Sequence, residues 1–142
     1  MSVTIAYEAE ATASGGRDGK ASIKDGNLDI RLATPKALGG NGDGNNPEQL
    51  FAAGYSACFL GAMKFAASQD KALPRVPSNA TVTAAVGIGP RSDKGFGLRV
   101  ALTISLPEVE RAAAEALVAE ADTICPYSHA TRGNIEVSIN VA

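Results

Sequence analysis

The sequence predicts an α+β domain over residues 1–142, with the element order βββ-α-ββ-α-β. Three observations support this prediction. Alternating apolar residues open the chain and return in its second half, a long apolar run covers residues 46–65, and an amphipathic stretch covers residues 107–124. Alternation is typical of half-buried strands, and apolar residues three and four positions apart are typical of helices. A length of 142 residues is usual for one domain.

Three short strands are expected before the apolar run. They cover Ser2 to Thr12, Lys20 to Lys24 and Leu28 to Ala33. A glycine-rich turn separates the first two, and Asp25 to Asn27 has the composition of a hairpin turn. The expected arrangement is an antiparallel meander. The segment Thr34 to Asn45 then predicts a long surface loop that could cover a site.

Residues 46–65 predict the central helix. Asn46 and Gln49 have the spacing of a capping box, with a proline at the first helical position. The stretch that follows is apolar on every side, which is typical of a buried helix. Its uncharged part is shorter than the roughly 20 residues that a membrane span needs. We therefore expect a buried core helix that ends near residues 68–71 and carries Cys58.

The second half predicts a hairpin, a helix and a last strand. Residues 80–88 and 97–106 alternate and contain β-branched side chains, so we expect them to form a long hairpin. Residues 107–124 predict an amphipathic helix that Pro107 opens and the proline at position 126 stops. Residues 135–141 alternate again and predict the final strand.

The composition narrows the class of protein. Hydrophobic residues make up 45% of the chain and aromatic residues only 5%. Small side chains bury little area each, which favours further burial against a second subunit. A net charge of −2 argues against a protein that binds nucleic acid, which would need a basic surface. Because no apolar segment follows Met1, we expect a cytoplasmic protein without a membrane partner.

Cys58 and Cys125 are the candidate reactive residues. In a reducing cytosol, a cysteine pair is more often catalytic or redox-sensing than structural. The alternative is a pair of buried, inert thiols, since free cysteine is among the most buried residue types. A reactive cysteine must be a thiolate, which needs a nearby positive charge or hydrogen-bond donors. Arg17, in a glycine-flanked turn, could supply that charge, although most arginines in such turns are solvated.

Glu48 is a further candidate, although a glutamate in the first turn commonly complements the helix dipole. Glu48 and Cys58 lie ten positions apart, so on one straight helix they are separated by about 15 Å along the axis. They cannot share a site within one unbroken helix. If they cooperate, we expect the two groups to come from two copies of the chain packed antiparallel.

The segment after Cys125 contains His129, the one histidine of the chain. One histidine and two distant cysteines do not make a convincing zinc set, so we expect no metal site. His129 is interpreted as a polar residue in a turn, which Tyr127 and Arg132 could lock structurally.

Three segments together resemble the organic hydroperoxide resistance (Ohr) proteins of the Ohr/OsmC family. They are residues 15–19 (Gly-Gly-Arg-Asp-Gly), residues 46–59, and residues 125–134 (Cys-Pro-Tyr-Ser-His-Ala-Thr-Arg-Gly-Asn). Residues 34–40 fit the Ohr branch better than the OsmC branch. The resemblance covers essentially the whole chain, in the same element order.

The resemblance implies an OsmC-like fold and an intertwined homodimer with two sites at the subunit interface. It also implies a thiol peroxidase that reduces alkyl and fatty-acid hydroperoxides to alcohols. Cys58 matches the peroxidatic cysteine of the family, Cys125 the resolving cysteine, and Arg17 and Glu48 the activating pair. No bound cofactor is implied. The family's usual reductant is a dihydrolipoyl group carried on a protein partner.

Several readings stay open at this point. Phe51, Tyr55 and Phe59 are candidates for lining an apolar substrate pocket, although such spacing more often marks plain core. A non-enzymatic redox sensor or binding module would use the same cysteines as a switch. A structural dimer would carry two inert thiols, and an OsmC-type peroxidase is a neighbouring variant. The natural peroxide, the reductant in the cell and any movement of residues 34–45 are not determined by the sequence.

Overall fold

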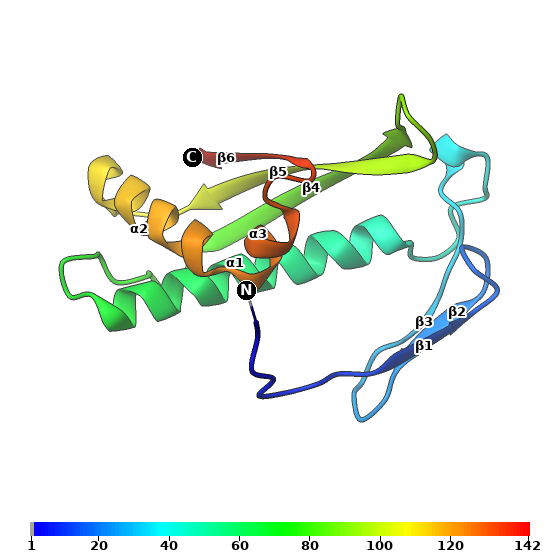
Figure 1. Cartoon of the computed structure of the whole chain (residues 1–142), viewed down its shortest axis with the longest axis horizontal. Helices are drawn as coiled ribbons and strands as arrows, with labels where there is room; N and C mark the ends of the chain where they lie inside the picture. Colours follow the sequence, from blue (N-terminus) through cyan, green and yellow to red (C-terminus); the bar gives the residue numbers. More distant parts are fainter. Residues whose placement is uncertain (1) are drawn as a thin grey trace. The chain divides into compact units, whose positions relative to one another are not determined.

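The computed structural model describes residues 2–142 and confirms the α+β class (Figure 1). The elements, in order, are β1 (Ala11–Ser14), β2 (Lys20–Ile23), β3 (Asp29–Arg31), a 3₁₀ turn η1 (Lys36–Leu38), α1 (Pro47–Gln69), β4 (Thr81–Pro90), β5 (Phe96–Ser105), α2 (Arg111–Ile124), α3 (Pro126–Thr131) and β6 (Glu136–Val141). The chain divides into two compact units, Met1–Leu50 and Phe51–Ala142, which are described in turn. The expectation of one domain over the whole chain stays a prediction.

In the first unit, β1, β2 and β3 form the predicted antiparallel sheet. The first strand is much shorter than expected, because only Ala11–Ser14 pairs with β2. Within residues 2–10, the apolar side chains of Val3, Ile5 and Tyr7 are 70%, 69% and 83% exposed. Apolar residues do alternate in this segment, but within residues 2–142 no strand pairs with it.

The predicted loop over residues 34–45 has a closed base. The amide of Ala33 donates to the carbonyl of Asn45, and the amide of Asn45 donates to the carbonyl of Arg31, both at 2.9 Å. The loop also contains the 3₁₀ turn η1, which the sequence did not predict. Leu32 and Ala33, which directly precede the loop, are buried. These hydrogen bonds therefore fix the two ends of the loop next to each other.

The start of α1 confirms the capping box. The amide of Gln49 donates to Asn46 Oδ1 at 2.9 Å, and the amide of Asn46 donates to Gln49 Oε1 at 3.0 Å. These two bonds satisfy backbone donors that the first helical turn otherwise leaves free. The helix then continues unbroken to Gln69, within the predicted range of ends.

Within one chain, α1 buries one face. That face carries Tyr55, Phe59, Ala62, Met63 and Ala66. Opposite them, small side chains and the 54% exposed Phe65 face outward. The expectation that no segment is long enough to span a bilayer was wrong on length, because α1 extends past the uncharged stretch at both ends. This is weak evidence for a membrane span, since the core helix of a soluble protein meets the same criteria.

In the second unit, α1 runs along one face of the sheet β4-β5-β6 (Figure 1). The predicted long hairpin is confirmed, with β4 and β5 antiparallel, whereas β6 pairs with β5 in parallel. Val100, Leu102 and Ile104 of β5 are buried in the core with Leu117 of α2. One face of the sheet and one face of each long helix thus form a single apolar core.

Two predictions for the second half need correction. Helix α2 begins at Arg111 rather than at Pro107, because Glu108 has a positive φ of 63°, which a helix does not accept. Glu110 caps it instead, accepting hydrogen bonds from the amides of Ala112 and Ala113. The predicted turn after Cys125 is a short helix, α3, which begins at a proline.

Candidate active site

The two cysteines lie together although 67 positions separate them in the sequence. The thiol of Cys125 donates toward Cys58 Sγ across 3.4 Å, and both cysteines are free. Cys125 is fully buried, whereas Cys58 is partly accessible. An accessible thiol backed by a buried one is the arrangement that lets one cysteine react with a substrate and the other close a disulfide.

Cys125 occupies the corner between α2 and α3. Its backbone is extended, with φ −60° and ψ 121°, so it ends one helix and precedes the next. Its amide donates to the carbonyl of Ala121, and its own carbonyl accepts the amide of His129. Pro126 occupies the first position of α3, where a missing amide hydrogen costs nothing. The local sequence therefore builds a corner that aims the thiol at α1.

The environment of Cys58 favours the neutral thiol. Burial raises the pKa of Cys58 to about 11, against a smaller lowering by the backbone amide of Tyr127. Hydrogen bonding and charge repulsion from the thiol of Cys125 make smaller contributions to this rise. The groups that set this pKa include no positive charge. A reactive Cys58 therefore needs a cation or further donors.

Arg17 and Glu48 form a bidentate ion pair in the first unit. Arg17 Nη1 donates to Glu48 Oε2 at 2.8 Å, and Nη2 donates to Oε1. The side chains are 34% and 12% exposed. The hydrogen bonds from Arg17 lower the pKa of Glu48, and the hydrogen bond to Glu48 raises the pKa of Arg17. The structure thus joins these two predicted residues, with the guanidinium permanently charged.

The turn that carries Arg17 has a fixed shape. Gly15 and Gly16 adopt positive φ values of 77° and 62°, which other residues rarely accept. A side chain at Gly19 would lie 1.9 Å from the carbonyl oxygen of Ser14. The glycines around the arginine are therefore a structural requirement of this turn.

Asp18 ties the same turn to the start of the following loop. Its Oδ1 accepts the amide of Thr34 at 3.0 Å, and its Oδ2 accepts the Thr34 hydroxyl at 2.9 Å. The backbone hydrogen bond is the larger of the two effects that lower the pKa of Asp18. Asp18 was not among the predicted site residues, although its place beside Arg17 in a glycine-rich turn was an available signal.

The structure brings the four predicted residues together as two pairs, one in each unit. Glu48 lies in the first turn of α1 and Cys58 near its middle. Because α1 is unbroken between them, the rise of a helix separates the two residues by about 15 Å along the axis. The helix of one chain therefore does not bring Glu48 to its own Cys58.

Of the three pocket candidates, two are core residues in this chain. Tyr55 and Phe59 are fully buried. Phe51 is only partly buried and packs against the rings of Tyr55 and Tyr127, with centroids 6.2 and 6.0 Å away. Phe51 thus remains the candidate that an apolar substrate could reach.

Tyr127 has a larger place in this site than the sequence analysis gave it. Its ring lies against Gly54, where an added Cβ would stand 3.0 Å from the Tyr127 hydroxyl. It is 39% exposed and lies two positions after Cys125. In the sequence, the glycine one turn before Cys58, within an alanine-rich helix, could have predicted that another segment packs closely there.

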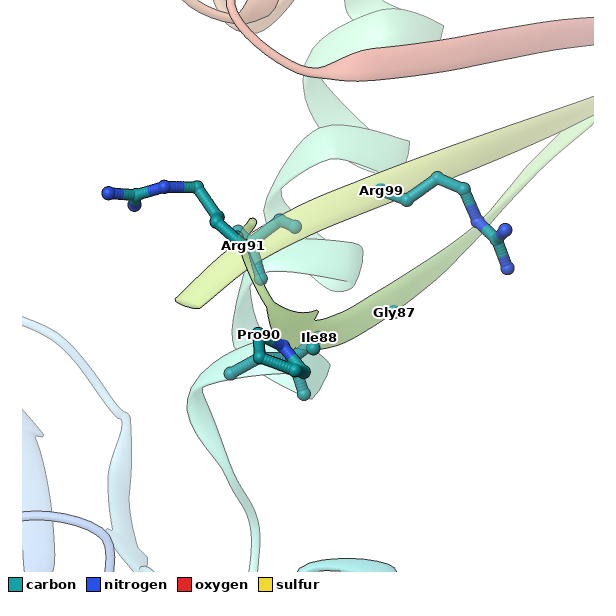
Figure 2. A pocket seen from close by; sticks show the side chains of 8 residues that line it. Gly87, Ile88, Pro90, Arg91 and Arg99 are labelled. Atoms are coloured by element: carbon teal, nitrogen blue, oxygen red, sulfur yellow. The ribbon is translucent and has the colours of Figure 1, made fainter. Parts of the chain in front are cut away.

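A separate cavity lies at the tip of the long hairpin (Figure 2). It has a volume of about 410 Å³ and is lined by Gly87, Ile88, Gly89, Pro90, Arg91, Gly97, Leu98 and Arg99. Arg91 and Arg99 point in different directions, and Arg91 is bound to Asp93 and to the carbonyl of Phe96. The lining of this cavity includes neither cysteine. Over residues 2–142, no three His, Cys, Asp or Glu side chains gather as a metal ion would require.

Comparison with known proteins shows the family of this chain. The sequence profile of the family described as OsmC-like protein matches residues 40–140. The chain is 51% identical over 139 residues to an organic hydroperoxide resistance protein of Xanthomonas axonopodis pv. citri (strain 306), covering 97% of this chain and 96% of that one. This chain belongs to the OsmC-like family.

Solved structures of organic hydroperoxide resistance proteins share the fold of this OsmC-like chain. One from Elizabethkingia anophelis superimposes with a TM-score of 0.90 at 45% identity and covers 99% of both chains. Another, from Legionella pneumophila, gives a TM-score of 0.90 at 42% identity and covers 98% of this chain and 99% of the other. The predicted family and the predicted OsmC-like fold are both confirmed.

Proposed function

We propose that this OsmC-like protein is a peroxidase that reduces organic hydroperoxides to alcohols, with Cys58 as its nucleophile. The observation that carries the proposal is the 3.4 Å approach of Cys125 Sγ to Cys58 Sγ. Relatives named for resistance to organic hydroperoxides, at up to 51% identity over nearly the whole chain, support the substrate class. The partly buried Phe51 beside the site fits the apolar part of such a substrate.

In the first step, the Cys58 thiolate attacks the distal oxygen of the hydroperoxide. The sulfur–oxygen bond forms as the oxygen–oxygen bond breaks, and the leaving alkoxide takes up a proton to become the alcohol. Cys58 is left as a sulfenic acid, two electrons more oxidised. Since burial raises the pKa of Cys58 to about 11, this step needs a group that stabilises the thiolate.

In the second step, the Cys125 thiolate attacks the Cys58 sulfur. A disulfide forms, and the hydroxide that leaves takes up a proton to become water. The two sulfur atoms must approach from 3.4 Å to about 2.05 Å. A dihydrolipoyl group on a protein partner then reopens the disulfide by exchange and becomes the oxidised lipoyl disulfide itself.

The activating charge, in this proposal, is Arg17 of a second copy of the chain. The Arg17–Glu48 pair is preformed, but the unbroken α1 separates Glu48 from Cys58 of the same chain. The outward face of α1 and residues 2–10 expose apolar side chains that a partner would cover. An intertwined homodimer would bury these surfaces and complete two sites. Each guanidinium would then stabilise a thiolate and the developing charge on the peroxide oxygens.

The test is steady-state reduction of cumene hydroperoxide with dihydrolipoamide as the reductant and hydrogen peroxide in parallel. We expect turnover that is fast with the organic peroxide, slow with hydrogen peroxide and lost in Cys58→Ser. Cys125→Ser should undergo one oxidation at Cys58 and then stop. A single oxidation per wild-type chain without turnover on any dithiol would contradict the peroxidase and favour a redox sensor.

A further inference from the structure

A buried cluster of three hydroxyl groups links α1 to α3. Tyr55 Oη lies 2.9 Å from Ser128 Oγ and 3.2 Å from Thr131 Oγ1. Tyr55, Ser128 and Thr131 are 0%, 2% and 6% exposed. A buried hydroxyl without a hydrogen-bond partner costs free energy, so this cluster resists any shift of α3 along α1.

The hydroxyl cluster and the thiol pair join the same two segments. Tyr55 lies three positions before Cys58, and Ser128 lies three positions after Cys125. On a helix, residues three apart lie on neighbouring turns. Along α1, the hydroxyl cluster therefore lies about one helical turn from the thiol pair. Along α3, it lies one turn after Cys125.

Helix α3 depends on such tertiary contacts for its position. It has only six residues, too few for a helix to be stable alone. Thr131 Oγ1 also donates within α3, to the carbonyl of Tyr127 at 3.0 Å, and the guanidinium of Arg132 bonds Asp122 of α2. The first contact stabilises α3 internally, and the second joins its end to α2. The hydrogen bonds of the Tyr55 hydroxyl join α3 to α1, the helix that carries Cys58.

We propose that Tyr55, Ser128 and Thr131 are positioning residues for disulfide closure. They hold α3 so that Cys125, at its N-terminal corner, stays within reach of Cys58. Fixing two reacting groups close together raises their effective concentration, and a small loss of register lowers it steeply. The inference rests on the proposed function for the step that oxidises Cys58, but closure of the disulfide can be measured separately.

The decisive variant is Tyr55→Phe, which removes the hydroxyl and keeps the buried ring. Reduced protein is mixed with one equivalent of cumene hydroperoxide. Dimedone trapping then gives the rate of sulfenic acid formation, and acid quenching with thiol alkylation gives the rate of disulfide closure. We expect the ratio of closure rate to sulfenic acid formation to fall about tenfold. With excess peroxide, the longer-lived sulfenic acid should yield more sulfinic acid at Cys58 by mass spectrometry.

Two further variants separate positioning from general stability. Ser128→Ala removes the other end of the 2.9 Å bond and should lower the ratio similarly, and the double variant should be no worse than either single one. Ile104→Val loosens the core at β5, outside the two helices that the hydroxyl cluster joins, and should lower the melting temperature without changing the ratio. An unchanged ratio in Tyr55→Phe, or an equal fall in Ile104→Val, would overturn the proposal.

Diamide distinguishes this inference from the proposed function. Its nitrogen–nitrogen double bond accepts two electrons and two protons from the Cys58 and Cys125 thiols, giving a hydrazine and the disulfide. If the wild type does not react with the organic hydroperoxide, the proposed function fails, yet diamide still reports closure. Slower closure in Tyr55→Phe would then support the positioning role, and closure at the wild-type rate would refute it.

Discussion

At the scale of the residue, Cys58 lies beside a second thiol, but its surroundings within one chain favour the unreactive protonated form. With its pKa raised to about 11, only about one thiol in ten thousand would be ionised at pH 7. Arg17 is already held by Glu48 in a bidentate pair, so its planar fork is oriented before it meets a thiol. In the proposed mechanism, activation therefore depends on bringing the oriented guanidinium of Arg17 to Cys58.

Arg17→Ala should raise the pKa of Cys58 in the assembled protein. Only the thiolate reacts with iodoacetamide, so the alkylation rate at pH 7 should fall in the variant, and its rise with pH should move to higher pH. The measurement is the alkylation rate of Cys58 between about pH 5 and pH 10, with Cys125→Ser as background. Arg75→Ala, at an exposed site between α1 and β4, serves as the matched control. Identical profiles for Arg17→Ala and its parent would rule out the activating role.

Glu48 should contribute a pH-dependent part of the stability. Hydrogen bonds from Arg17 lower its pKa in the folded state. This contribution is complete above the unfolded carboxyl pKa of about 4.3 and is lost as the pH falls through the lower folded value.

In urea unfolding at about pH 6 and pH 3, Glu48→Gln should therefore lose less free energy of unfolding on acidification than the wild type. Glu120→Gln, at an exposed site in α2, should behave like the wild type. A loss in Glu48→Gln as large as that of the wild type would contradict this assignment.

At the scale of the element, α1 holds a residue of each pair, and its start determines where Glu48 stands. The reciprocal bonds between Asn46 and Gln49 fix the first turn, and Glu48 lies within it. The corner at Cys125 has the same function for the second thiol, because the end of α2 and the start of α3 meet there. One residue of each pair, Glu48 and Cys125, is thus positioned by a helix end.

Asn46→Ala should destabilise the protein by about 1 kcal/mol, the usual cost of losing a side-chain N-cap. Asn46→Asp keeps an acceptor at the cap and should retain most of the stability. The free energy of unfolding in urea would measure both. Asn41→Ala removes a comparable side-chain acceptor from the exposed loop and should cost less. Equal losses in Asn46→Ala and Asn46→Asp would show that the cap is not the source.

At the scale of the whole molecule, the single chain leaves apolar surface uncovered in both units. Val3, Ile5 and Tyr7 project from a segment without strand partners, and α1 turns small side chains and Phe65 outward. An exposed apolar surface commonly marks an interaction site. A second copy of the chain is the partner that would also bring an Arg17–Glu48 pair to each Cys58.

Mixed dimers of Cys58→Ser and Arg17→Ala should regain activity. If each site takes Cys58 from one chain and Arg17 from the other, the mixed dimer contains one complete site and one doubly defective site. Unfolding and refolding an equimolar mixture should then restore about a quarter of wild-type activity, since half of randomly formed dimers are mixed. Each variant refolded alone is the control, and activity no greater than their average would contradict shared sites.

Much of this molecule was determined by local sequence. The order of the strands and the two long helices, the hairpin, the capping box at Asn46 and the stop at Pro126 were predictable, because each depends on residues within a few positions. The four candidate residues were also named from the sequence and the family resemblance. In the structure, these residues form two close pairs.

Only the tertiary structure decided the rest, because it depends on partners far away in the chain. No local pattern states that two thiols 67 positions apart lie within 3.4 Å, that β6 runs parallel to β5, or that the Tyr55 hydroxyl meets α3. The positive φ of Glu108 delays α2, and within residues 2–142 no strand pairs with the segment that carries Val3, Ile5 and Tyr7. Local sequence sets which elements can form, whereas long-range packing decides which of their side chains meet.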